Sequence, residues 1–140
     1  MTRVRELAWL ALGSNLGDRA GHLRAAVEAI GAWPETRIVA TSSVEETAPL
    51  GGMDQPPYLN QMVLIETGLE PRALLEHCHA VERQEGRART ERWGPRTLDV
   101  DIVRYGRRRV DEPDLVIPHP GVADRDFWQR ELAELEPHAR

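Results

Sequence analysis

The sequence contains no lysine, and all 18 of its basic residues are arginine. This absence excludes a Schiff-base lysine, a lysine general base and a P-loop lysine that binds phosphate. A Walker phosphate loop, a zinc-ligand pattern and a nucleophile elbow are missing as well. The run from Gly13 to Gly17 resembles a glycine-rich phosphate loop, but it lacks the lysine and the Walker spacing. We interpret this run as a tight turn before a helix.

Cysteine is nearly absent, because Cys78 is the only one and no disulfide can form within the chain. Its position in a helical pattern between Leu74 and Val81 predicts a small core residue. Long apolar runs are also missing: the longest, around residues 7–12, is far too short to span a membrane. The N-terminus lacks the apolar segment of a signal peptide. We therefore expect a soluble, cytoplasmic protein without a membrane partner.

The 140 residues, 41% of them hydrophobic, have the size and composition of one compact domain, and we expect residues 1–140 to form it as a monomer. The formal net charge is −5, and aromatic residues make up only 5% of the chain. RNA-binding sheets usually carry aromatic side chains and a basic face. The composition therefore argues against a nucleic-acid partner, although Arg104 and the run from Arg107 to Arg109 leave an RNA-binding module as an alternative.

Hydrophobic periodicity divides the chain into alternating strands and helices. Asp18 can cap the first helix, Pro71 suits the first turn of the second, and Gly106 is expected to turn a short hairpin into Val110. The expected strands are residues 7–12, 37–44, 58–67 and 98–103, and helices are expected to begin near residues 18, 71 and 124.

The order strand, helix, strand, strand, helix, strand is the split βαβ pattern of a ferredoxin-like α+β sandwich. We therefore predict a mostly antiparallel sheet with helices packed on one face. This fold supports many unrelated functions, so the order of elements alone does not indicate one.

Asp99 and Asp101 flank Val100 on a predicted strand. Residues at positions i and i+2 of a strand point to the same face, so Asp99 and Asp101 share a face and lie about 6.6 Å from each other along the strand. Leu98, Val100 and Ile102 point to the opposite face. Paired carboxylates suit Mg²⁺, which keeps several waters and shares itself with substrate phosphates. The alternative is an exposed strand face whose aspartates form ordinary ion pairs.

A fourteen-residue stretch upstream of this pair, residues 83–96, contains five arginines and only two glutamates. The arginines are Arg83, Arg87, Arg89, Arg92 and Arg96. A polyphosphate site needs both charges, because metal ions neutralise some phosphate oxygens and guanidinium groups bind others bidentately. The alternative is a solvated helix end, where the helix dipole also favours arginine.

Two further features suggest small-molecule recognition. The period of the strand at residues 58–67 puts Tyr58 and Asn60 on one face, where an aromatic ring and an amide suit a planar heterocycle. His119 lies between Pro118 and Pro120, which fix the backbone around it, so its imidazole could donate to a phosphate. A purely structural histidine is the alternative.

The run from Arg92 to Ile102, with its Trp93-Gly94-Pro95-Arg96 segment, resembles the signature of the 6-hydroxymethyl-7,8-dihydropterin pyrophosphokinases of folate biosynthesis. Other segments match in the same order: residues 12–17, 47–60, 86–89 and 117–120. The resemblance implies a ferredoxin-like fold, two Mg²⁺ ions and ATP as co-substrate. It also implies a reaction in which the pyrophosphoryl group of ATP passes to the hydroxymethyl oxygen of the pterin, leaving AMP.

The resemblance implies a role for each matching residue. Asp99 and Asp101 match the metal ligands, and Arg87 and Arg96 match arginines that hold the phosphates during transfer. The residues matched to nucleotide binding are Glu82, Arg89, Trp93, Ile102, Leu115, His119 and Arg125. The residues matched to the pterin pocket are Thr47, Ala48, Leu50, Tyr58, Asn60, Trp93 and Phe127, with Tyr58 and Phe127 expected on either side of the ring.

The chain departs from the family pattern at a few positions. His79 stands where a glutamine is common, so we leave it outside the expected site. Gln129 and Arg130 interrupt a stretch that is normally apolar. A nucleotidyltransferase-like enzyme with the same metal pair and a different acceptor remains an alternative at this point.

Overall fold

The computed structural model describes residues 5–48, 55–86 and 97–139. Its main sheet has five strands in the order β2–β4–β1–β5, with β3 pairing to another part of β4. The strands of this sheet are β1 (Glu6–Ser14), β2 (Thr36–Thr41), β3 (Glu45–Thr47), β4 (Tyr58–Thr67) and β5 (Asp99–Tyr105). Both β1 and β2 run antiparallel to β4, which lies between them, and so form a split βαβ unit around α1. The predicted α+β class with an antiparallel sheet is confirmed.

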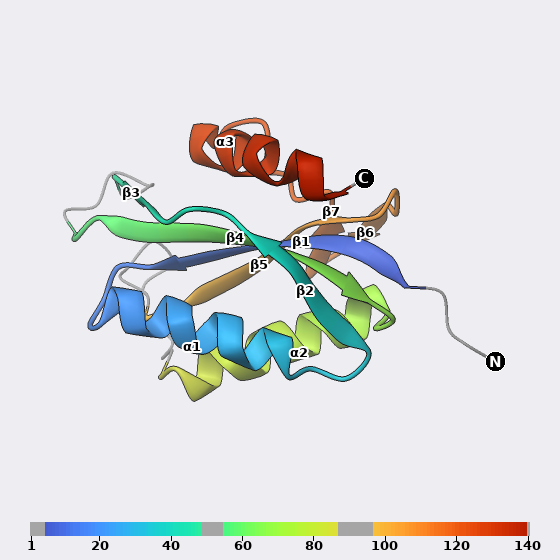
Figure 1. The fold of residues 1–140 in the computed structure, drawn as a ribbon, viewed down its shortest axis with the longest axis horizontal. Coiled ribbons are helices and arrows are strands. Elements are labelled where there is room, and N and C mark those ends of the chain that lie inside the picture. Colours follow the sequence, from blue (N-terminus) through green and yellow to red (C-terminus); the bar gives the residue numbers. More distant parts are fainter. Residues whose placement is uncertain (1–4, 49–54, 87–96, 140) are drawn as a thin grey trace.

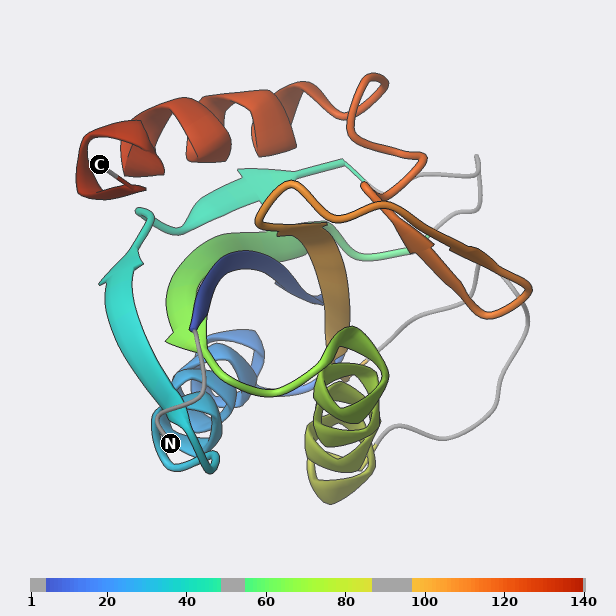
Figure 2. The ribbon, with the colours of Figure 1, turned by 90° about the vertical axis from the view of Figure 1, so that its right-hand side faces the viewer.

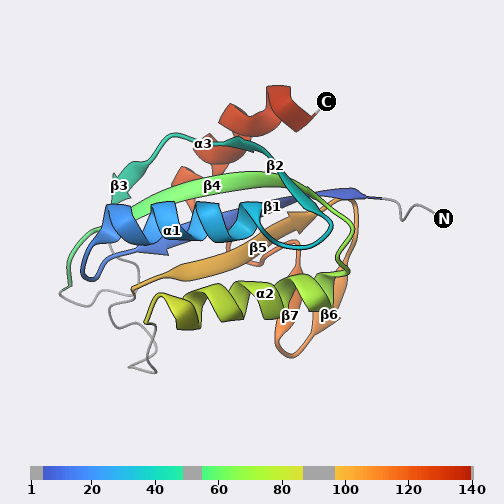
Figure 3. The ribbon, with the colours of Figure 1, turned by 60° about the horizontal axis from the view of Figure 1, so that its bottom comes forward.

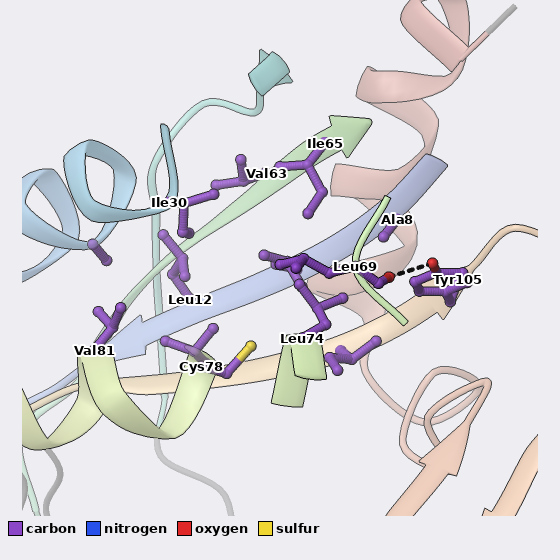
Figure 4. Packing of buried hydrophobic residues seen from close by; sticks show 14 of the residues in the cluster. Ala8, Leu12, Ile30, Val63, Ile65, Leu69, Leu74, Cys78, Val81 and Tyr105 are labelled. Atoms are coloured by element: carbon purple, nitrogen blue, oxygen red, sulfur yellow. Dashed lines mark hydrogen bonds between the residues drawn. The ribbon is translucent and has the colours of Figure 1, made fainter. Parts of the chain in front are cut away.

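Two helices cover one face of this sheet, α1 (Arg19–Gly31) and α2 (Pro71–Gln84) (Figure 1). The Asp18 side chain accepts a hydrogen bond from the Gly21 amide at 3.1 Å and caps α1, as predicted. The buried stripe of α2 includes Leu74, Cys78 and Val81, which pack towards β1 and β5 (Figure 4). Burial raises the pKa of the Cys78 thiol well above its usual range, which agrees with a core residue.

A third helix, α3 (Asp126–Leu135), lies on the opposite face of the sheet and leads into a short 3₁₀ turn, η1 (Glu136–Ala139) (Figures 1 and 2). The prediction of helices on one face describes α1 and α2 but not α3. The physical reason is that the strands also carry apolar side chains on their second face. That second cluster joins Trp128, Leu132 and Leu135 of α3 to Ala11, Met62, Leu64 and Val103 of the sheet.

The prediction of a hairpin between the strand at residues 98–103 and Val110 is wrong. After β5 the chain turns at Gly106, which has a φ of +51°, and then forms a separate ribbon of β6 (Val110–Glu112) and β7 (Leu115–Ile117). This ribbon lies beside α2 (Figure 3). Leu115 and Ile117 of β7 are buried in the core cluster that also contains the buried stripe of α2, so burial brings the ribbon against both the helix and β5. Arg72 of α2 adds ion pairs with Glu112 and Asp114.

Glu131 is an unusual member of the interface between α3 and the sheet. It is only 2% exposed, and among the described residues neither of its carboxylate oxygens has a hydrogen-bond partner. Burial, together with the nearby carboxylates of Glu45 and Glu134, raises its pKa to about 8. The guanidinium of Arg130 opposes this rise but is ion-paired with Glu45. Glu131 is therefore protonated at neutral pH while α3 is docked.

This proton makes the fold sensitive to alkaline pH. The folded-state pKa of about 8 lies above the ordinary 4.5, so the folded chain keeps a proton that the unfolded chain loses. We expect the free energy of unfolding to fall as pH rises from 4.5 to about 8, by on the order of 3–5 kcal/mol. Glu131→Gln should remove most of this dependence between pH 6 and 8.5, and the exposed Glu28→Gln should retain it. Equal slopes for all three proteins in urea denaturation would contradict the assignment.

Candidate active site

Strand β5 places the two predicted metal ligands together. Val100 and Ile102 are buried against α2, whereas the Asp101 side chain is 41% exposed and Asp99 is half-buried. The alternation predicted from the sequence is therefore confirmed, and both carboxylates lie on the face of the sheet that α3 covers further along.

A cleft of about 310 Å³ opens beside β5. Its walls come from α2, β5, the turn and strand of the β6–β7 ribbon and the segment after β7. It brings together six of the predicted site residues: Glu82, Asp99, Asp101, Ile102, Leu115 and His119. Four of these were matched to nucleotide binding and two to the metal, and they come from α2, β5, β7 and the segment after β7.

His79 also lines this cleft, although we left it outside the expected site. Leu75, His79 and Glu82 are spaced i, i+4 and i+7 on α2, and such residues share one helix face. All three line the cleft. That spacing, measured from Glu82, is the sequence signal that could have identified His79.

Glu82 fastens α2 to the strand that carries the aspartates. It is buried, and its carboxylate accepts a hydrogen bond from the Val100 amide at 2.8 Å. Because β5 ends the strand order, the outward N–H of Val100 needs an acceptor from outside the ladder. Glu82 supplies that acceptor and so fixes the distance between the helix wall and the floor of the cleft.

His119 is presented to the cleft as a neutral imidazole. Its backbone amide donates a hydrogen bond to the Val103 carbonyl at 2.9 Å, and the Gly121 amide donates one to its Nδ1 at 2.9 Å. Nδ1 is therefore the acceptor and Nε2 carries the proton, 3.9 Å from a carboxylate oxygen of Asp101. Burial and, to a smaller extent, the charge of Arg125 lower the pKa of His119 to about 4, so this contact is polar but is not an ion pair at neutral pH.

The predicted pterin residues of β4 adjoin the aspartates across β1. Gly13 pairs with Asn60 on one side and with Asp99 on the other, so these three residues form one row across the sheet. Strands lie about 4.8 Å apart, which puts the backbones of Asn60 and Asp99 roughly 10 Å from each other. A Cβ on Gly13 would come within 3.3 Å of both the Asn60 amide oxygen and the Tyr58 ring. Glycine therefore lets both side chains lie over β1.

The Asn60 side chain also joins β4 to β3. Its Nδ2 donates to the Thr47 hydroxyl at 2.6 Å, which connects two of the predicted pterin residues. Ala48 follows at the exposed end of β3. Asn15 and Arg19 hold the segment that enters β4: Asn15 donates to the Pro56 carbonyl at 3.0 Å, and Arg19 donates to the Pro57 carbonyl at 2.9 Å.

The remaining expected residues are divided between α3 and segments outside the described residues. Phe127 is half-buried at the start of α3, its ring centroid 6.3 Å from that of Trp128, on the sheet face that carries Tyr58. Arg125 directly precedes α3. Five expected site residues lie outside the described residues: Leu50, Arg87, Arg89, Trp93 and Arg96.

Comparisons with known proteins agree with this arrangement. A profile of the 7,8-dihydro-6-hydroxymethylpterin-pyrophosphokinase family matches residues 9–137. A 2-amino-4-hydroxy-6-hydroxymethyldihydropteridine pyrophosphokinase of Methylorubrum extorquens is 45% identical over 130 residues, 93% of this chain and 82% of that protein. The proteins of the same name from Pseudomonas aeruginosa and Bacillus subtilis are 42% and 41% identical over 132 residues, 94% of this chain and 82% and 79% of theirs.

The chain belongs to the 7,8-dihydro-6-hydroxymethylpterin-pyrophosphokinase family. The expected enzyme class is thereby confirmed: a transferase that moves the pyrophosphoryl group of ATP to hydroxymethyldihydropterin in folate biosynthesis. The match favours this interpretation over a nucleotidyltransferase with another acceptor and over an RNA-binding module. Within the described ranges, no helix has the length and apolar character needed to cross a membrane.

Asn60 provides a test of the pterin side. Asn60→Ala should weaken pterin binding by about 1–3 kcal/mol, because a buried hydrogen-bonding edge would lose its partner, and should leave ATP affinity nearly unchanged. Gln61→Ala is a matched control: Gln61 is the next residue on β4, points to the opposite face and donates one hydrogen bond to the Ser42 carbonyl. Titration calorimetry with each ligand checks this. Equal weakening of pterin and ATP binding by Asn60→Ala would count against the pocket.

Proposed function

We propose that this chain transfers the pyrophosphoryl group of ATP to the hydroxymethyl oxygen of 6-hydroxymethyl-7,8-dihydropterin, giving AMP, with ATP in the cleft beside β5 and the pterin over β1 and β4. The observation that carries the proposal is the row from Asn60 through Gly13 to Asp99 on one face of the sheet. A site for a heterocycle and a site for a metal–phosphate group adjoin there. The acceptor hydroxyl and the transferred phosphate can thus meet above Gly13.

The pterin ring lies between Tyr58 and Phe127 in this proposal, with Asn60 and Thr47 bonding to its polar edge. The hydrogen bond from Asn60 to Thr47 supports it, because it holds the Asn60 amide in one orientation before the ligand arrives. An amide offers both a donor and an acceptor, which suits a pterin edge that carries both. Ala48, Leu50 and Trp93 complete the proposed pocket.

The nucleotide lies between α2 and the β6–β7 ribbon. Ile102 and Leu115 are buried at the cleft and offer apolar contacts to the base and sugar. His119 donates its Nε2 proton to a phosphate oxygen, and because its pKa is about 4 it stays neutral over the physiological pH range. Glu82 holds the α2 wall in place, and Arg125 binds on the nucleotide side together with Arg89 and Trp93.

Asp99 and Asp101 suit Mg²⁺ because their carboxylate oxygens are the kind of ligand that this ion prefers. No group of three or more His, Cys, Asp and Glu side chains within the described ranges could hold a metal by itself. Two carboxylates suit an ion whose other ligands are water and phosphate oxygens. When bound, Mg²⁺ ions, of which we propose two, neutralise phosphate charge during transfer. The arginines Arg87 and Arg96 bind the remaining phosphate oxygens in this proposal.

Positioning accounts for most of the catalysis in such a site, since phosphoryl transfer requires alignment and charge neutralisation more than a strong base. The described cleft is lined by two histidines and four carboxylates, of which Glu82 is bonded to the Val100 amide and Asp114 is paired with Arg72. The sequence has no lysine to act as a base. The acceptor hydroxyl is therefore held in line with the transferred group, and its proton leaves to a phosphate oxygen or to water.

We further propose that residues 1–140 act as one domain, as a monomer and in the cytoplasm. The net charge of −5 supports small-molecule substrates over a nucleic-acid partner.

The reaction is tested by product analysis. The protein is incubated with ATP, Mg²⁺ and 6-hydroxymethyl-7,8-dihydropterin, and nucleotides are separated by chromatography. We expect AMP and the pterin diphosphate in equal amounts. ADP as the main nucleotide product would overturn pyrophosphoryl transfer.

The metal pair is tested by Asp99→Ala. Losing one charge-stabilising element in phosphoryl transfer costs roughly 10³–10⁵ in rate, so turnover should fall by that factor while the thermal midpoint stays close to that of the unaltered protein. Asp111→Ala, an exposed residue of β6, is the matched control and should keep normal turnover. Both are assayed with and without Mg²⁺. Near-normal turnover of Asp99→Ala would show that this aspartate forms only surface contacts.

A further inference from the structure

Trp128 contacts two side chains of the proposed nucleotide side without being expected in the site itself. It lies in the first turn of α3 and is only 3% exposed. Its indole packs into the second hydrophobic cluster with Met62, Val103 and Leu132. The orientation of this ring is therefore set by the core of the protein.

The first contact is with Arg125. The Cζ atom of its guanidinium lies 4.3 Å from the centroid of the indole, which is a cation–π distance. The group also lies close to Gly121, because a Cβ there would be 3.0 Å from both Cζ and Nε of Arg125. Contacts with a glycine and with an aromatic ring thus restrict the guanidinium before any ligand binds.

The second contact is with His119. The two rings are nearly perpendicular, at 85°, with their centroids 4.9 Å apart. The Gly121 amide bonds to Nδ1 of the same imidazole. Trp128 and Gly121 therefore fix the ring together: the amide sets the direction of Nε2, and the indole limits the tilt of the ring.

We propose that Trp128 is a positioning residue for the nucleotide side of the reaction, holding the His119 imidazole, which lines the cleft, and the Arg125 guanidinium in their binding orientations. The inference rests on the proposed function, since it takes Arg125 and His119 as nucleotide ligands. A leucine at position 128 would fill much of the same apolar space but would offer no π face to Arg125. A phenylalanine would keep a smaller face.

The experiment measures affinity for a non-hydrolysable ATP analogue with Mg²⁺ by calorimetry, and records the thermal midpoint of each protein. The variants are Trp128→Leu, Trp128→Phe, Arg125→Ala and the double variant of Trp128→Leu with Arg125→Ala. Trp33→Leu is the matched control. Trp33 also packs perpendicular to a histidine, His77, at 5.4 Å, and neither residue lines the cleft.

We expect Trp128→Leu to weaken analogue binding by about 5–30-fold, and Trp128→Phe to restore most of that loss, in line with a partly desolvated cation–π contact. Trp33→Leu should change affinity by less than about twofold, even if its thermal midpoint falls as far as that of Trp128→Leu. In the Arg125→Ala background the loss from Trp128→Leu should shrink at least about threefold, because the side chain through which it acts is gone.

Two results would overturn the role of Trp128 alone: an equal loss from Trp128→Leu with and without Arg125, which indicates a general packing effect, or an equal loss from Trp33→Leu. Failure of the unaltered protein to bind the ATP analogue would instead remove the nucleotide site itself, and this inference with it.

Discussion

The alternation of side chains along β5 is the constraint on which the rest of the site depends. Val100 and Ile102 must be buried under α2, so Asp99 and Asp101 must face the other way. A shift of one residue in the pairing with β1 would bury both carboxylates. The pairing of Gly13 with Asp99 fixes this register, and it also places Asn60 in the same row. One register therefore aligns the metal ligands with the pterin residues.

The edge position of β5 adds a second requirement. An edge strand has outward amides that need acceptors, and here the buried carboxylate of Glu82 meets the Val100 amide. A buried carboxylate is stable only with hydrogen-bond donors around it, which contrasts with Glu131 under α3. Glu131 lacks such donors and takes up a proton instead. The described part of the chain thus contains two buried glutamates, one of which fixes the cleft while the other makes the docking of α3 depend on pH.

Side-chain periodicity predicted those features that depend on a single helix or strand. The faces of β4 and β5 and the buried stripe of α2 all follow from side-chain spacing. The position of α3 could not be predicted in this way, because the hydrophobic pattern of a helix does not specify which face of a sheet the helix covers. The β6–β7 ribbon was missed because three-residue strands carry little periodic signal, and its ion pairs with Arg72 join distant segments. Trp128 was missed for a related reason: its importance comes from contacts with Arg125 and His119, which only the folded loop before α3 brings together.

The two walls of the cleft are held by different kinds of interaction. The α2 wall is anchored by burial of Cys78 and Val81 and by the hydrogen bond of Glu82 to the β5 backbone. The ribbon wall is tied to α2 by Arg72 with Asp114 and, through the preceding turn, by Arg108 with Glu70, and all four side chains are largely exposed. Exposed ion pairs are weak and are screened by salt, whereas buried contacts are not. The exposed turn between β6 and β7 can therefore adjust to a nucleotide at little cost, whereas β7, whose Leu115 and Ile117 are buried in the core, and the strand that carries Asp99 and Asp101 keep their places.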